Sequence, residues 1–271
     1  MPLDVPLDPA AAPAARPRLV VLPAAALAGV LALAWLAERS GWVGGRVARS
    51  VGVPAAHGAL LTAALGAADR RWRWHAGLLL ALLAAAAAAT AWSAWGACLY
   101  LTVPLALTAI ARREPALAGV GLCAPPDGLT VLLGAGVGLA LGGHLLLSAS
   151  RTFGYEIRAV PLEHYLVAIA YDLGANVPSA ESFFRGVVFN RAQRRWPFLP
   201  AAALATAAAL LRYLVDPALP RAVETVVAAV FYLSVLSVAG CALFWRSGSV
   251  LPGALAAMGF FACYRAVRGW W

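Results

Sequence analysis

The chain has 271 residues, of which 62% are hydrophobic and only 12% are charged, and this composition excludes a water-soluble enzyme as the leading interpretation. A mean hydropathy of +0.79 and repeated apolar runs of near-spanning length indicate a polytopic membrane protein. The net charge of +9 would suggest a nucleic-acid partner in a soluble chain, but all 21 basic residues are arginine and most lie between the apolar runs. They therefore predict anchors at the membrane edge and no nucleic-acid binding.

The first predicted elements are a tail and two membrane spans. Residues 1–18 are rich in proline and lack apolar periodicity, which predicts a disordered tail. Residues 19–36 predict a retained first span. Residues 51–68 predict a weaker second span, and the arginine- and tryptophan-rich residues 70–74 after it are typical of the membrane interface.

The next apolar run covers residues 76–110 and is too long for one helix across the membrane. Its 35 residues would extend about 52 Å, against a hydrocarbon core of about 30 Å. We therefore predict a break at residues 93–96, a loop at 116–128 and another span at 129–149. That last span contains glycines that would let a neighbouring helix approach closely: Gly134, Gly136, Gly138, Gly142 and Gly143.

The remainder of the chain is apolar but carries charges in unusual places. Residues 161–173 and 178–195 contain ionisable side chains, which are costly inside a membrane. Residues 198–215, 223–245 and 250–267 predict three closing spans. The expected fold is an all-α polytopic transmembrane bundle of seven to nine helices.

The cysteines and histidines do not predict a metal site, and no cofactor is expected. His144 lies among glycines and is predicted to be packed or hydrogen-bonded, while His57 and His75 are expected at the membrane interface. The four cysteines show no paired spacing and have no nearby histidine, so that neither a disulfide framework nor a zinc site is predicted for them: Cys98, Cys123, Cys241 and Cys263.

Residues 180–186, with the sequence Ala-Glu-Ser-Phe-Phe-Arg-Gly, are the strongest candidate for a functional segment. Glu181 and Arg185 are four residues apart and share one face of a helix, with the acid first, which is the favourable order for an ion pair. Such a pair inside a membrane indicates either a functional site or a polar brace between helices, and both interpretations stay open.

This segment resembles the first motif of the CPBP family, intramembrane glutamic-type proteases that process CAAX proteins and bacteriocins. The family motif is Glu-Glu-x-x-x-Arg, often followed by Gly, and the chain matches it from the second Glu onward. Residues 245–256 also resemble the stretch that leads into the last motif of the family. The resemblance covers about residues 160–265 and implies a CPBP-like membrane core at 151–271, after amino-terminal transmembrane helices at 19–150.

The resemblance implies hydrolysis of a peptide bond by a motif Glu and a histidine that activate water, with a second histidine and an asparagine at the oxyanion. This chain departs from that pattern. Ala180 stands at the first Glu, Arg212 at the first histidine, Ala257 at the second histidine and Phe261 at the asparagine. Alanine has no proton acceptor, and a protonated arginine cannot act as a base.

These substitutions predict a catalytically impaired enzyme or pseudoprotease, in which Glu181 and Arg185 remain as a bracing remnant of the motif. Whether the chain is an enzyme stays open, because His164, Asp172 and Glu181 could form a substitute acid–base cluster. The alternatives are a non-enzymatic binding or assembly subunit and a small transporter-like bundle. The expected partners are the lipid bilayer, here a bacterial inner membrane, and a membrane-embedded or lipidated protein.

Overall fold

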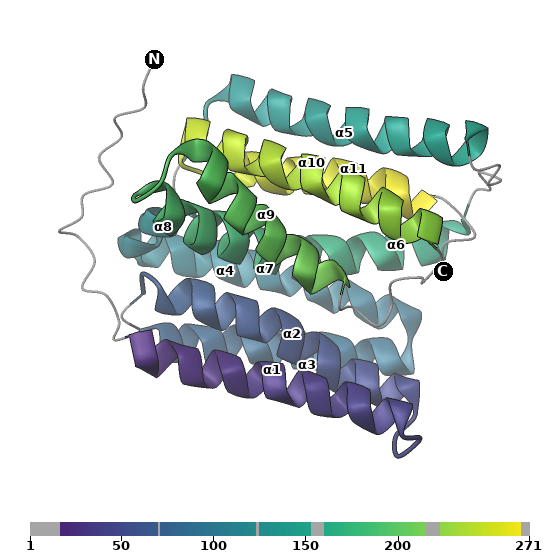
Figure 1. Ribbon diagram of the computed structural model, residues 1–271. Helices are drawn as coiled ribbons and strands as arrows, with labels where there is room; N and C mark the ends of the chain where they lie inside the picture. The colour runs from purple at the N-terminus through teal and green to yellow at the C-terminus, as the bar shows by residue number, and fades with distance from the viewer. Residues whose placement is uncertain (1–16, 70, 123–124, 153–159, 215–222, 267–271) are drawn as a thin grey trace. The chain divides into compact units, whose positions relative to one another are not determined.

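The structure is a computed structural model that describes residues 17–69, 71–122, 125–152, 160–214 and 223–266 (Figure 1). These residues form helices and no β-strand, which confirms the all-α prediction. The predicted disordered tail lies outside the described residues, except for its last two positions, where the first helix begins. The described residues fall into two compact units. The first unit lies within 17–122 and 170–183, and the second within 125–169 and 184–266.

Five helical segments of the described residues are long and apolar enough to cross a membrane, and the protein is an integral membrane protein. The weaker span predicted at 51–68 is helical but is not one of these five segments. The expected total of seven to nine helices also counts shorter apolar helices such as Phe198–Leu214. The five segments are Val20–Arg39, Trp72–Trp92, Ala94–Arg113, Gly128–Arg151 and Val226–Ser247.

The first unit begins with helices α1, α2 and α3, which pack side by side in chain order (Figure 1). Their bounds are Pro17–Arg39, Gly45–Gly66 and Trp72–Trp92. The predicted break follows α3, where Ser93 adopts an extended conformation. The chain continues as the 3₁₀-helix η1 (Ala94–Leu101), helix α4 (Thr102–Arg113) and the 3₁₀-helix η2 (Pro115–Val120).

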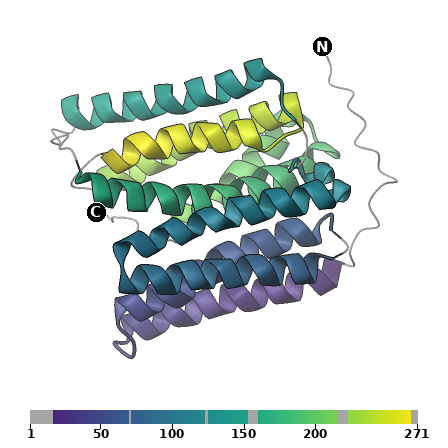
Figure 2. The ribbon, with the colours of Figure 1, turned by 180° about the vertical axis from the view of Figure 1, so that it is seen from behind.

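The second unit contains the long helix α5 and the three closing helices. Helix α5 lies beside α11 in both views (Figures 1 and 2). Gly134 and Gly138 of α5 lie against the backbone carbonyls of Pro252 and Ala256 of α11, where an added Cβ would come within 2.3 and 2.2 Å of these oxygens. The predicted close approach of a helix is thus confirmed. The bounds are Gly128–Arg151 for α5, Phe198–Leu214 for α9, Val223–Ser247 for α10 and Leu251–Ala266 for α11.

The core of the second unit combines aromatic and small side chains. Phe189 is fully buried, and its ring makes edge contacts with Phe198 and Phe244 at centroid distances of 5.7 and 6.1 Å. Alanines on α9 allow that helix to come close to this aromatic group. The other buried members of the cluster are Ala192, Ala201, Ala202, Ala205 and Cys241.

Candidate functional site

The motif segment, residues 180–186, lies on one continuous helical stretch that contains two π-helical parts. The sequence favours a helix end near Asp172, before Gly174, but the helix continues through this point. Pro178 has no N–H group for the carbonyl of Gly174, and the wider π turn accommodates this missing bond. The stretch comprises α6 (Leu162–Tyr171), η3 (Asp172–Asn176), α7 (Val177–Ala180), η4 (Glu181–Phe189) and α8 (Asn190–Gln193).

Both ionisable residues of the motif are buried on η4. Glu181 is 3% exposed and belongs to the first unit, and Arg185 is 5% exposed and belongs to the second. The guanidinium of Arg185 lies against Gly240 of α10, where an added Cβ would be 3.0 Å from its Nε. Gly240 therefore leaves room for the guanidinium. Bracing of Glu181 and Arg185 against each other stays a prediction.

The members of the predicted substitute cluster have very different exposures. His164 is exposed on α6. Asp172 is fully buried, and its carboxylate accepts a hydrogen bond from the side-chain amide of Asn176 at 3.0 Å. Only the two acids of the cluster, Asp172 and Glu181, lie in the protein interior. A catalytic role for His164 stays a prediction.

The positions at which the chain departs from the family motifs are mostly buried and apolar. In the first unit, Ala180 is 4% exposed. In the second unit, Ala257 and Phe261 of α11 are 4% and 6% exposed. The guanidinium of Arg212 on α9 lies 4.6 Å from the ring centroid of its neighbour Tyr213.

In the second unit, the residue next to one motif position contacts another motif position. The ring of Tyr213, next to Arg212, lies 6.3 Å from the ring of Phe261, measured between centroids. The assignment from the sequence places Arg212 and Phe261 in two different family motifs. Neither side chain can accept a proton at neutral pH.

A buried polar network beside Ala180 was missed by the sequence analysis. His57 of α2, expected at the membrane interface, lies in the middle of its helix and is only 1% exposed. Its Nδ1 is 2.8 Å from the hydroxyl of Ser179, and its Nε2 is 2.8 Å from the hydroxyl of Tyr171. This arrangement, the His57 network, connects α2 with the residues just before the motif, all within the first unit.

The hydrogen bonds of the His57 network are consistent with one tautomer of a neutral imidazole. Ser179 donates its hydroxyl proton to the carbonyl of Ala175 at 2.7 Å. His57 then donates from Nδ1 to the Ser179 oxygen, and Nε2 accepts from Tyr171. The signal in the sequence was a histidine inside an apolar run, because a polar group in lipid surroundings needs a partner.

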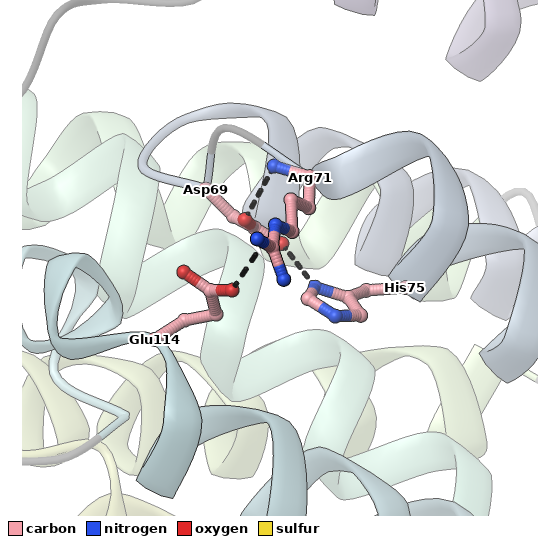
Figure 3. A network of polar contacts seen from close by, with 4 residues as sticks. All are labelled: Asp69, Arg71, His75 and Glu114. Atoms are coloured by element: carbon pink, nitrogen blue, oxygen red, sulfur yellow. Dashed lines mark hydrogen bonds and ion pairs between the residues drawn. The ribbon is translucent and has the colours of Figure 1, made fainter.

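A second polar cluster of the first unit lies at the turn before α3 and at the end of α4 (Figure 3). Asp69 accepts a hydrogen bond from the backbone N–H of Arg71 at 2.7 Å, and its other oxygen is 2.5 Å from Nδ1 of His75. Glu114 points toward the same centre from the end of α4. One ligand atom from each of Asp69, His75 and Glu114 lies within 4.8 Å of the others.

His144, predicted to be packed or hydrogen-bonded, has its expected partner in the second unit. Its Nδ1 is 2.7 Å from the hydroxyl of Tyr232 on α10. The Tyr232 hydroxyl also lies 3.1 Å from the hydroxyl of Ser148. These contacts give His144 a structural explanation.

Part of the chain matches a known protein family. Residues 163–262 match the family model described as type II CAAX prenyl endopeptidase Rce1-like. The matched segment contains Glu181, Arg185 and the substituted motif positions. No curated protein and no solved structure matches the chain. The resemblance to the CPBP family is therefore confirmed over residues 163–262, and the chain is a CAAX-protease-like membrane protein with an Rce1-like segment.

Proposed function

We propose that the chain binds a membrane-embedded or lipidated protein segment without cleaving it, as a pseudoprotease of the CAAX-processing type. The observation that carries this proposal is the chemistry at four motif positions. The family mechanism needs two groups that activate water and two that stabilise the oxyanion. Here these four positions hold Ala180, Arg212, Ala257 and Phe261.

Burial of the substituted positions supports the loss of hydrolysis. Ala180 and Ala257 are each 4% exposed, so protein atoms cover the positions where the family places its general base and one oxyanion donor. The ring contact between Tyr213 and Phe261 fills space at the second and last motifs with apolar surface. Apolar side chains at Ala180, Ala257 and Phe261 cannot activate water for attack on a peptide bond.

Retention of the motif remnant supports a role in the fold. Glu181 and Arg185 keep the residue types and spacing of the family, and both are buried. The chain lacks the water-activating groups but retains Glu181 and Arg185. This pattern is expected when a protein keeps its binding function and loses hydrolysis. The proposed location is a bacterial inner membrane.

Binding and cleavage can be measured separately on the purified chain in lipid vesicles. The probe is a farnesylated CAAX peptide that carries a photoactivatable crosslinker. We expect the wild-type chain to crosslink to the peptide and to leave its peptide bond intact. Glu181→Gln should reduce crosslinking, whereas Glu163→Gln, at an exposed glutamate of α6, should not.

The same assay gives two results that would contradict the proposal. Cleavage by the wild-type chain that is lost in Glu181→Gln or His164→Ala would show an active enzyme with a relocated site. Absence of both crosslinking and cleavage by folded protein would remove the binding function and favour an assembly subunit. A chain with Ala180→Glu, Arg212→His, Ala257→His and Phe261→Asn then tests whether the lost groups alone account for inactivity.

A further inference from the structure

We propose that Asp69, His75 and Glu114 of the first unit bind a divalent first-row transition metal ion, with zinc as the best match. One ligand atom from each residue lies within 4.8 Å of the other two. Ligand atoms that bind zinc at about 2.0–2.2 Å lie up to about 4.4 Å from one another, so small side-chain movements complete the geometry. This site lies outside residues 163–262 and is independent of the proposed function.

The carboxylate of Asp69 is the fixed point of this site. Its side chain is completely buried. One oxygen accepts the backbone N–H of Arg71 at 2.7 Å, which holds the carboxylate in place, and the other oxygen faces Nδ1 of His75 at 2.5 Å. Metal sites commonly use such a hydrogen bond from a neighbouring group to orient a ligand. A bound ion would replace the hydrogen bond between Nδ1 of His75 and Asp69.

The other two ligands leave one side of the site open. The side chains of His75 and Glu114 are 20% and 22% exposed, so an ion and its water can enter. Three protein ligands and one water is the arrangement typical of open zinc sites. A nitrogen ligand disfavours calcium and magnesium, which prefer oxygen, and favours zinc among the common biological ions.

The charge of the cluster also matches a divalent cation. Two carboxylates and a neutral imidazole carry two negative charges, which a divalent ion balances. In the described structure, Arg71 provides a positive charge, with its Nε 4.0 Å from the carboxylate of Glu114 (Figure 3). The Arg71 side chain is 76% exposed, so it can move toward solvent when an ion enters. Arg71 and the metal therefore compete for the carboxylate of Glu114.

The test is titration of the purified, chelator-treated chain with zinc in detergent, followed by calorimetry and by measurement of bound metal. We expect one zinc ion per chain. Asp69→Asn, His75→Gln and Glu114→Gln should each weaken binding by about tenfold or more, the effect that even outer-shell changes reach at metal sites. His144→Ala is the matched control, because His144 already bonds Tyr232, and should leave binding unchanged.

Arg71→Gln distinguishes a metal site from a purely structural ion-pair cluster. If the cluster binds metal, removing the competing cation should leave zinc affinity unchanged or tighten it. If Asp69→Asn does not fold, zinc binding by Glu114→Gln and His75→Gln tests the proposal, because both of these side chains are partly exposed. The proposal is overturned if the folded wild-type chain shows no saturable zinc binding, if the ligand variants bind as the wild type does, or if Arg71→Gln loses binding.

Discussion

Two regions of the molecule hold their helices together by different physical interactions. The α5–α11 interface of the second unit relies on close backbone approach, with Gly138 against the carbonyl of Ala256. The His57 network of the first unit relies on side-chain hydrogen bonds that join the buried His57 to the hydroxyls of Ser179 and Tyr171. Apolar surface alone does not drive helices to associate in lipid. Close packing or polar contacts must therefore hold them together.

The α5–α11 interface and the His57 network should therefore respond to different substitutions. An interface built on backbone approach has no spare volume and fails when a side chain is added. A region built on hydrogen bonds tolerates some volume change but fails when a donor or acceptor is removed and its partner stays buried. Substitutions of each kind can therefore break one region and spare the other.

The largest expected effect is that of Gly138→Leu. An added Cβ would lie 2.2 Å from the carbonyl oxygen of Ala256, and backbone atoms cannot move aside as a flexible side chain can. We expect a loss of roughly 3 kcal/mol in the free energy of unfolding, at the upper end for overpacking. Thermal unfolding in detergent, followed by circular dichroism, measures this loss.

Gly136→Leu is the matched control for Gly138→Leu. Gly136 lies on the same helix, is exposed, and has open space where its Cβ would be. We expect its unfolding to stay within about 0.5 kcal/mol of the wild type. Equal destabilisation by both substitutions would mean that helix propensity, and not the contact with α11, explains the effect.

The next effect is that of His57→Ala. The substitution removes a fully buried imidazole and leaves the Tyr171 hydroxyl without its 2.8 Å partner. We expect a loss of about 2 kcal/mol in the free energy of unfolding, within the range for removing one partner of a buried hydrogen bond. His164→Ala, at an exposed position of α6, should change stability by less than about 0.5 kcal/mol.

The difference in stability between His57→Ala and His164→Ala also tests how much the first unit depends on the His57 network. If His57→Ala is as mild as His164→Ala, the first unit does not depend on its polar network and must be held by packing. Gly174, whose added Cβ would lie 2.3 Å from the carbonyl of Tyr100, would then be the contact to change.

A smaller effect is expected at a hydrogen bond of the second unit. Thr206 of α9 donates its hydroxyl to Ser237 of α10 at 3.0 Å, and both are buried. Thr206→Val keeps the shape and removes the donor, so we expect a loss of about 0.6 kcal/mol, the average for hydrogen bonds between membrane helices. Thr108→Val is the control, because the exposed Thr108 bonds only Pro104 of its own helix. A loss above 2 kcal/mol would contradict the view that this unit depends on packing.

The sequence predicted the helices and one interface well, because both follow from local composition and periodicity. Gly134, Gly138 and Gly142 recur every four residues and share one face of α5, and each lies against α11. Gly136 and Gly143 were included in the same prediction, but their Cβ positions are open. The four-residue period, and not the number of glycines, determines which of them pack against a neighbour.

The His57 network and the cluster of Asp69, His75 and Glu114 could not be predicted to the same extent. His57 and Ser179 are 122 residues apart, and Glu114 comes to Asp69 from a different helix, so no spacing in the sequence shows either contact. The π turns before the motif depend on one missing N–H at Pro178 and on tertiary packing. The motif positions of Arg212 and Phe261 followed from family resemblance, and only the folded chain shows that Tyr213 contacts Phe261.

The last and smallest effect concerns the pH dependence of the start of α5, in the second unit. Asp127 caps this helix: its carboxylate accepts the hydroxyl of Thr130 at 2.6 Å and the backbone N–H of Thr130 at 2.9 Å. These bonds, with the charge of Arg246, lower the pKa of Asp127 below its ordinary value of 3.8. Arg246 in turn donates to the Thr130 hydroxyl at 2.9 Å.

A lowered pKa in the folded state has a definite sign. The folded chain holds the Asp127 proton less tightly than the unfolded chain, so the carboxylate stabilises the fold above pH 3.8 and this contribution is lost as the pH falls through the lower folded pKa. Asp127→Asn should remove this pH-dependent component while keeping a cap of similar strength. Thr130→Val should shift the midpoint of the component upward, because it removes the side-chain hydrogen bond that contributes most to lowering the pKa of Asp127. Unfolding midpoints measured from about pH 6 to about pH 2 test both variants. An unchanged acid profile in Asp127→Asn would assign the pH dependence to other carboxylates and leave α5 dependent on its packing against α11.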